Sequence, residues 1–205
     1  MNTYYQFVGC ATPGCTSLAL TGESTCGQHL DDPDAYRRKI LQACHAHESF
    51  AEWILAGVDF SHQNLAGANF SSACLAQCNF NDAVLTGAVL FRANLDQATL
   101  QNTDLEGANL QLAILGRANL SGAHLKGADL QRANLVGVRA SSADLEGARL
   151  FYARPGNADF SNASLRGADL TRAIFRRADL RHADLRGCTG KANFDQANLE
   201  GVKWE

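Results

Sequence analysis

The sequence predicts an all-β solenoid, a square coil with four pentapeptide units per turn. Three observations predict it. An apolar residue, nearly always leucine, occupies every fifth position from Leu55 to Leu185, and alanine with asparagine or aspartate usually precedes it. Glycine recurs two residues after it at intervals of twenty, from Gly67 to Gly187. Internal repetition of this kind determines the architecture before any other sequence feature.

A period of five residues fits neither regular element. Five residues turn an α-helix by about 140° beyond one full turn, so no apolar stripe forms. On a strand the odd number would send successive apolar residues to opposite faces. Each unit must therefore bend. Ala93 and Leu95 share the inward face of a short extended piece, and the residues on either side form corners.

Glycine forms a column in only one of the four sets of corners, which indicates four units per circuit with residues twenty apart stacked above one another. Glycine suits corners with positive φ, as in a type II turn. The residue before each glycine mostly alternates in charge, as in Glu106, Lys126, Glu146 and Arg166. At a strand spacing of about 4.8 Å these side chains form an exposed ion-pair ladder, worth about 0.2–1 kcal/mol per pair.

Tandem units such as Ala-Asn-Leu at 93–95 and Ala-Asp-Leu at 128–130 resemble those of the pentapeptide-repeat proteins. The resemblance covers about residues 57–204. It implies a right-handed quadrilateral β-helix, here of about seven to eight coils. It also implies a binding scaffold, since most of the family is thought to serve as one, while a subset resembles B-form DNA and binds DNA gyrase.

The repeat is broken in three places. Small residues replace the leucine at Ala140 and Pro155, and a phenylalanine lies twenty residues after each, which close packing favours. Pro155 also removes one N–H from the ladder, so the wall is expected to bulge there. One residue is lost between Leu185 and Phe194, which predicts an irregular corner at 187–190.

The residues before the coil divide into two parts. Residues 32–56 are expected to form a capping helix over the first coil, because Asp32-Pro33-Asp34 is a helix start. Apolar residues then follow at spacings of three and four, and Gly57 is a plausible stop. Residues 1–31 form a separate small unit, and residues 57–205 form the β-helix.

Residues 1–31 contain a candidate zinc site made of Cys10, Cys15, Cys26 and His29. Three thiols and an imidazole in two close pairs are the ligands of tetrahedral Zn²⁺, and Pro13-Gly14 supplies a tight turn. The pattern resembles short zinc-ribbon or treble-clef knuckles of bacterial proteins. The alternatives are small buried cysteines in an irregular loop, or redox chemistry. A structural, closed site is favoured because so short a segment buries little core.

The other cysteines predict packing rather than chemistry. Cys44 and His47 lie one helical turn apart and could share a metal, although packing against the first coil is the preferred interpretation. Cys78 and Cys188 occupy inward positions that usually hold alanine, so they are expected to be inert core residues.

Composition excludes several classes of protein. The 18 basic and 21 acidic side chains nearly balance, which argues against a generic nucleic-acid binder. No membrane span and no secretory signal are visible, and seven cysteines fit a reducing cytoplasm.

Residues 161–191 are basic, with seven basic side chains against three acidic ones. They form either a solvated end of the coil or a docking surface for an acidic partner.

A candidate partner surface lies along one corner, where aromatic and arginine side chains mix as they do in interfaces. We call these residues the partner corner: Phe91, Arg92, Leu112, Arg132, Phe151, Tyr152 and Arg172. The C-terminal coil has no predicted helical cap, so an end-to-end homodimer through it is a further hypothesis.

The leading functional prediction is a non-catalytic protein–protein interaction scaffold, a rigid rod with a zinc-clipped cap, in a bacterial cytoplasm. The repeats provide no nucleophile, base and oxyanion site together. The alternative is a DNA mimic that binds gyrase, although the arginines of 161–191 oppose mimicry of phosphates. A nucleic-acid adapter using the knuckle ranks lowest, because residues 1–56 are net acidic.

Overall fold

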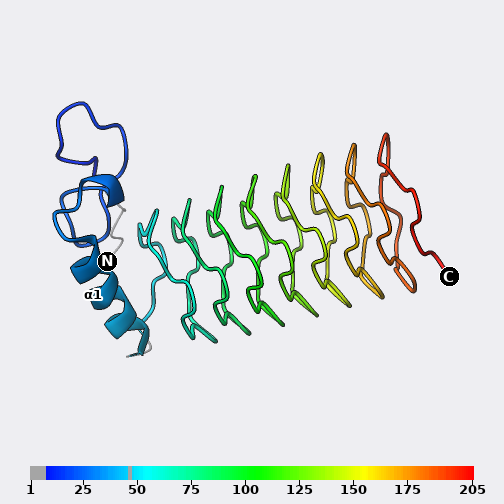
Figure 1. Ribbon diagram of the computed structural model, residues 1–205, viewed down its shortest axis with the longest axis horizontal. Helices are drawn as coiled ribbons and strands as arrows, with labels where there is room; N and C mark the ends of the chain where they lie inside the picture. The colour runs from blue at the N-terminus through cyan, green and yellow to red at the C-terminus, as the bar shows by residue number, and fades with distance from the viewer. Residues whose placement is uncertain (1–7, 46–47) are drawn as a thin grey trace, which may run out of the picture.

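A computed structural model describes residues 8–45 and 48–205 and contains the predicted solenoid. Parallel bridges pair residues twenty apart in four series, which begin with Ile54 to Cys74, Asp59 to Asn79, Asn64 to Val84 and Asn69 to Val89. Each series is one side of a square coil. Figure 1 shows these coils stacked into a rod, with the N-terminal residues at one end and the C-terminus at the other.

The leucine and alanine positions form the core, as predicted. Leu105 and Ala108 are fully buried, and their backbone groups join neighbouring coils. The Leu105 N–H donates to the His124 carbonyl at 2.7 Å, and the Asn109 N–H donates to the Ala88 carbonyl at 2.9 Å. A regular side of the square donates one backbone hydrogen bond to the next coil and one to the previous coil, and it accepts one from each of them.

The glycine corners have positive φ as expected, 65° at Gly127, but the conformation extends to all four corner columns. Arg92 has a φ of 58° and Leu112 a φ of 60°. A left-handed non-glycine residue costs about 1–2 kcal/mol, and this coil accepts that cost at many corners. A corner glycine therefore relieves strain locally, while the stacking of buried side chains forces the corner to form.

The preference for asparagine or aspartate before each leucine has a structural reason. The side-chain oxygen accepts a hydrogen bond from the N–H two residues later. The Asp96 N–H donates to the Asn94 side chain at 3.0 Å, and the Val136 N–H donates to the Asn134 side chain at 3.2 Å. Such Asx turns satisfy corner N–H groups that point away from the ladder. Where this position holds another residue type, such as Arg154, this cap is missing.

The capping helix is shorter than the sequence predicted. Helix α1 spans Pro33–His45, with the Asp32 carboxylate accepting the Ala35 N–H at 2.8 Å, whereas a helix to residue 56 was expected. The chain joins the coil by Phe50, whose N–H donates to the Asn69 carbonyl at 2.8 Å. The expected packing of His47 lies outside the described residues.

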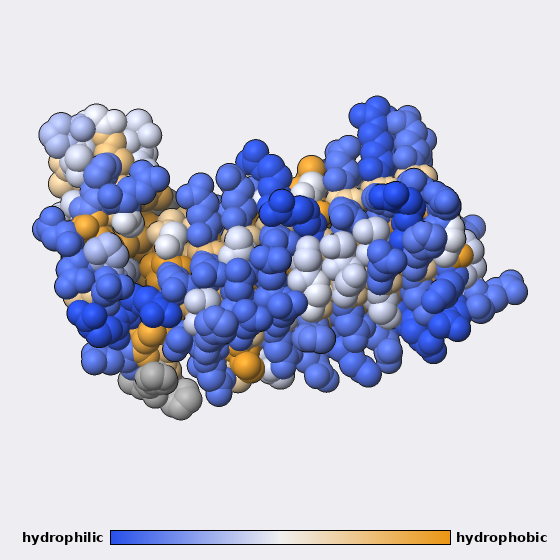
Figure 2. All heavy atoms as spheres, in the orientation of Figure 1, coloured by the Kyte–Doolittle hydropathy of each residue, from blue (hydrophilic) through white to orange (hydrophobic). Residues whose placement is uncertain are grey.

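The cap covers the N-terminal end of the coil. Buried Leu20, Tyr36 and Ile40 join the same core cluster as Phe50 and Phe60. Helix α1 lies across this end of the rod (Figure 1), and hydrophobic side chains gather where the cap meets the first coils (Figure 2). The covered end keeps the first apolar layer out of water.

The ladder breaks at Pro155, as predicted. The series Ile114 to Asn134 to Arg154 does not continue with a bridge from Arg154 to Ile174 among the described residues. The hydrogen bond from the Leu135 N–H to the Arg154 carbonyl is also long at 3.2 Å. The disturbance is local, because the Ile174 N–H still donates to the Ala153 carbonyl at 3.0 Å.

The irregular corner at 187–190 is also present. The register changes from twenty residues at Asp169 to Thr189 to nineteen at Ile174 to Asn193. Gly190 has a φ of 79°, and a Cβ there would lie 2.6 Å from the Thr171 backbone. Only glycine fits this close approach without moving the neighbouring coil.

The ion-pair ladder forms in part. Lys126 and Glu146 pair at 3.2 Å, but Arg166 turns to Asp184 at 3.9 Å instead of Glu146. In the described part of the chain, no helix has the length and apolar character needed to cross a membrane.

Candidate functional site

The structure brings the four predicted zinc ligands together. The ligand atoms of Cys10, Cys15, Cys26 and His29 all lie within 4.8 Å of one another. Cys26 is buried, Cys10 and Cys15 are half-buried, and His29 is exposed. The cluster lies in the small unit beside helix α1, away from the long axis of the coil (Figure 1).

Local turns position each pair of ligands. Gly14, with a φ of 79°, follows Pro13 in a turn closed by the Cys15 N–H and the Thr12 carbonyl at 3.1 Å. Pro then Gly at the two central positions is the type II pattern. In the second pair, Cys26 is the N-cap and His29 the last residue of the 3₁₀ helix η1 (Gly27–His29), which places side chains three residues apart on one face.

The distances fit one tetrahedral ion. A zinc–sulfur distance of about 2.3 Å places two thiolates of a tetrahedron about 3.8 Å apart. The sulfurs of Cys15 and Cys26 are 3.8 Å apart. The His29 Nδ1 lies 3.3 Å from the Cys26 sulfur and 3.5 Å from the Cys10 sulfur. Three sulfurs and one nitrogen match the four donors that a tetrahedral zinc site uses.

Hydrogen bonds prepare one thiol for metal binding. A side-chain hydrogen bond with Thr12 lowers the pKa of Cys10 to about 5, and the Cys26 N–H, 3.4 Å from the Cys10 sulfur, contributes. The thiolate is the metal-binding form, and the lowered pKa of Cys10 favours that form. Burial raises the pKa of Cys26, and a metal ion would displace that proton.

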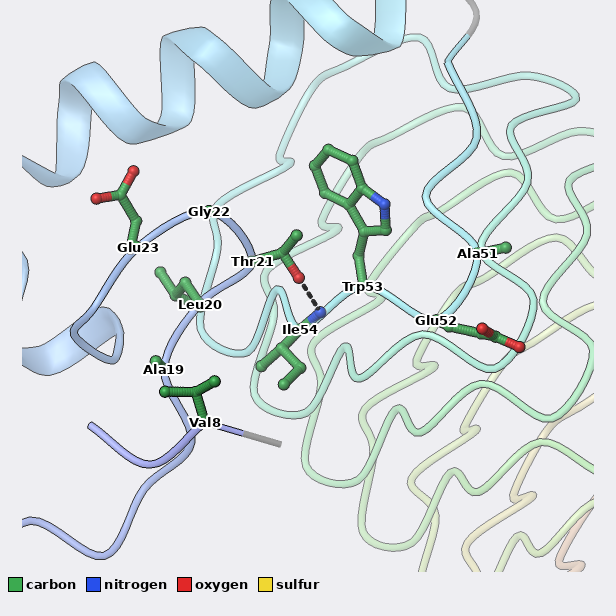
Figure 3. Close-up of a pocket in the computed structure, with 10 residues that line it drawn as sticks. All are labelled: Val8, Ala19, Leu20, Thr21, Gly22, Glu23, Ala51, Glu52, Trp53 and Ile54. Atoms are coloured by element: carbon green, nitrogen blue, oxygen red, sulfur yellow. Dashed lines mark hydrogen bonds between the residues drawn. The ribbon is translucent and has the colours of Figure 1, made fainter. Parts of the chain in front are cut away.

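The knuckle is attached to the first coil by Thr21. Its N–H donates to the Ile54 carbonyl at 2.9 Å, and its hydroxyl oxygen accepts the Ile54 N–H at 2.7 Å (Figure 3). These two bonds satisfy both backbone groups of Ile54 at the end of the coil. Helix α1 adds the Arg37 guanidinium, which donates to the Asp59 carbonyl at 2.7 Å. The Cys3His cluster therefore lies in the unit that terminates the ladder.

The partner corner occupies one edge of the rod, at positions that recur every twenty residues. Leu112 and Tyr152 are about two-fifths exposed. The Phe151 ring meets Tyr152 edge-on at 4.5 Å, and the Arg172 guanidinium lies 5.2 Å from the Tyr152 ring centre. Phe91 lies three coils from Phe151, so the structure brings the residues onto one edge without bringing all of them into contact.

Sequence reasoning missed Thr12 and Thr21. Thr12 lies between two predicted ligands, and a hydroxyl two residues after a cysteine was the available signal. Thr21 lies 33 residues from Ile54, and no periodic pattern joins the two.

Comparison with known proteins agrees with this geometry. Pentapeptide repeats, in eight copies, match residues 50–82, 78–117, 113–150 and 156–189. No curated protein matches the chain.

Several solved structures are similar to parts of it. HetL, a pentapeptide repeat protein involved in heterocyst differentiation regulation in the cyanobacterium Nostoc sp. strain PCC 7120, is 28% identical over 80% of this chain and 95% of HetL, with a TM-score of 0.39. A pentapeptide repeat protein of the Arabidopsis thaliana thylakoid lumen is 35% identical over 60% of this chain and 68% of its own, with a TM-score of 0.33. QnrB1, a plasmid-mediated fluoroquinolone resistance protein, is 24% identical in a trypsin-treated form, over 77% of this chain and 84% of its own, with a TM-score of 0.39.

The repeat matches cover most of the coil that the structure shows. They confirm the resemblance found in the sequence. The chain belongs to the pentapeptide-repeat family.

Proposed function

We propose that this chain is a non-catalytic protein–protein interaction scaffold, built on a right-handed square coil and closed at its N-terminus by a structural zinc site. The observation that carries the proposal is the closed Cys3His cluster joined through Thr21 to the first coil. A metal at this place stabilises the cap of a rod. The rod then presents fixed side chains to a partner at the strand spacing, and we place it in the cytoplasm.

The proposed binding surface is the partner corner. Phe151 and Tyr152 together expose aromatic edges, and Arg172 lies over one ring. Aromatic and arginine side chains dominate the binding energy of many interfaces. They stand at corners and not in the core, so they contribute little to the stability of the coil.

Replacing Phe151 and Tyr152 with alanine is expected to reduce capture of the partner at least about tenfold and to leave the thermal midpoint nearly unchanged. Affinity capture with quantitative mass spectrometry measures the first, and calorimetry the second. Ser161→Ala with Asn162→Ala, ten residues along at the opposite corner, is the matched control. Equal capture by the Phe151/Tyr152 variant and by the intact protein would contradict the proposed surface.

The gyrase alternative remains a second prediction drawn from the family resemblance. The exposed arginines of residues 161–191 oppose it, because a mimic of DNA needs negative charge in the place of phosphates. A supercoiling assay with purified gyrase distinguishes the two functions. Inhibition or protection at stoichiometric concentration would replace the scaffold proposal.

The homodimer through the C-terminal coil also remains a proposal. Phe194 stacks on Phe175 at 5.3 Å and meets Trp204 edge-on at 5.8 Å, and Trp204 is half exposed. Light scattering of a variant lacking residues 192–205 tests it, and an unchanged mass would exclude this interface.

A further inference from the structure

A groove lies on one wall of the coil, at the break in the ladder, and neither the zinc site nor the partner corner uses it. Its volume is about 370 Å³, and its lining includes Val136, Arg154, Gly156, Ile174, Arg176 and Arg177. We call it the Pro155 groove.

The backbone at this groove has unused hydrogen-bonding groups. Pro155 has no N–H, so the Ile174 carbonyl lacks the ladder donor that the Arg154 carbonyl receives from Leu135 at 3.2 Å. The Gly156 N–H also lacks an Asx cap, because residue 154 is arginine. In the preceding coil, Asn134 caps Val136 at this same position.

The next coil repeats this gap. Ile174 occupies the capping position, so the Arg176 N–H also has no partner among the described residues. The two uncapped corners are neighbours, since the Asn157 N–H donates to the Arg176 carbonyl at 2.9 Å. Two neighbouring coils therefore each have a corner N–H without a hydrogen-bond partner among the described residues, and a carboxylate-like oxygen would cap each of them.

Charge around these N–H groups is positive. Arg154 is exposed and has no carboxylate partner in the described parts of the chain. Arg177 binds only the neutral amide of Gln196 at 2.8 Å, while Arg176 pairs with Asp195 at 3.1 Å. Guanidinium groups bind carboxylates through two parallel hydrogen bonds, which makes arginine well suited to recognise them.

Two aliphatic side chains complete the surface. Val136 is 43% exposed and Ile174 is 38% exposed. They line the same groove as the arginines and the uncapped corners, so the groove is not a purely electrostatic patch, because an apolar side chain of a ligand gains by covering them.

We propose that the Pro155 groove binds an acidic segment of a protein partner. One carboxylate occupies the place of the missing Asx side chain at the Gly156 and Arg176 N–H groups and pairs with Arg154. An adjacent apolar side chain packs on Val136 and Ile174. This inference rests on the proposed scaffold function. It gives the scaffold a second binding surface, in addition to the partner corner, whose ligand is an acidic segment.

The test is an NMR titration of the ¹⁵N-labelled full chain with the blocked peptide acetyl-EEIDEE-amide. The Gly156 and Arg176 amide signals are expected to shift, and the neutral peptide acetyl-QQINQQ-amide is expected to leave them in place. Arg154→Asn should weaken binding about tenfold, because it removes the guanidinium and supplies the cap that Asn134 provides in the preceding coil.

The matched control is Arg139→Asn, which makes the same charge change at the capping position of another wall. It should leave the affinity nearly unchanged, since exposed charges a Debye length away are screened. The proposal would be overturned if the neutral peptide bound as tightly as the acidic one. It would also be overturned if Arg154→Asn and Arg139→Asn lost the same amount of affinity for the acidic peptide. Larger shifts of the same amides with inorganic phosphate or a single-stranded oligonucleotide than with the acidic peptide would do so too. Because no cellular partner is used, failure here leaves the partner corner and its capture experiment unaffected.

Discussion

Replacing Cys26 with serine is expected to unfold the N-terminal knuckle and leave the coil folded. Residues 8–31 bury little apolar surface apart from Ala19, Leu20 and Cys26, and a segment of this size does not fold on such a core. Structural zinc supplies about 10–16 kcal/mol in small zinc-binding peptides, which exceeds any other single interaction here. Loss of a ligand should therefore release the knuckle and its bonds to Ile54.

Metal analysis and hydrogen exchange measure the effect. The wild-type protein should contain about one equivalent of zinc, and Cys26→Ser less than half. The Thr21 amide, which donates to the Ile54 carbonyl at 2.9 Å, should lose its protection in the variant or after chelation. Cys74→Ser is the matched control, because Cys74 is a half-buried cysteine on the coil wall. Less than half an equivalent of zinc in the wild type, together with normal folding of Cys10→Ser, would contradict the proposal that zinc holds the knuckle together.

Replacing Leu110 with alanine is expected to cost about 2–5 kcal/mol of unfolding free energy. Leu110 is fully buried between stacked leucines of the same column, and neighbouring coils cannot collapse into the cavity without breaking their ladder. Leu112→Ala, two residues later at an exposed corner, is expected to change the free energy by less than about 0.5 kcal/mol.

Urea unfolding followed by circular dichroism measures both variants. The comparison is sharp because the same substitution is made twice in one pentapeptide, once at a fully buried position and once at an exposed corner. Similar losses at Leu110 and Leu112 would contradict the assignment of one as interior and the other as corner.

The sequence predicted the coil well because one steric rule repeats along it. Every buried leucine repeats the same packing. The spacing of twenty residues between Gly107 and Gly127 indicates four pentapeptide units per turn. The grouping of Cys10, Cys15, Cys26 and His29 was predictable because three thiols and an imidazole at short spacing are a specific pattern.

The end of the cap helix was not predictable from spacing. Ala51 and Ile54 continue the three-and-four pattern of a helix, yet they belong to the first coil, because Phe50 and Leu55 also satisfy the period of five. Tertiary stacking on the next coil decided between the two patterns.

The contacts of Thr21 with Ile54, and the uncapped corners at Gly156 and Arg176, required coordinates. The sequence shows that asparagine is absent at positions 154 and 174. Only the structure shows that asparagine caps the corner, and that the two gaps adjoin the ladder break at Pro155.

The fold and both proposed binding surfaces depend on the twenty-residue stacking of the coil, and scalar couplings across hydrogen bonds test this stacking directly. A long-range HNCO experiment on the deuterated protein should correlate the Leu105 amide nitrogen with the His124 carbonyl carbon, and the Asn109 nitrogen with the Ala88 carbonyl. Correlations of these nitrogens with carbonyls four residues earlier would instead indicate an α-helix and would contradict the fold and the surfaces assigned to it.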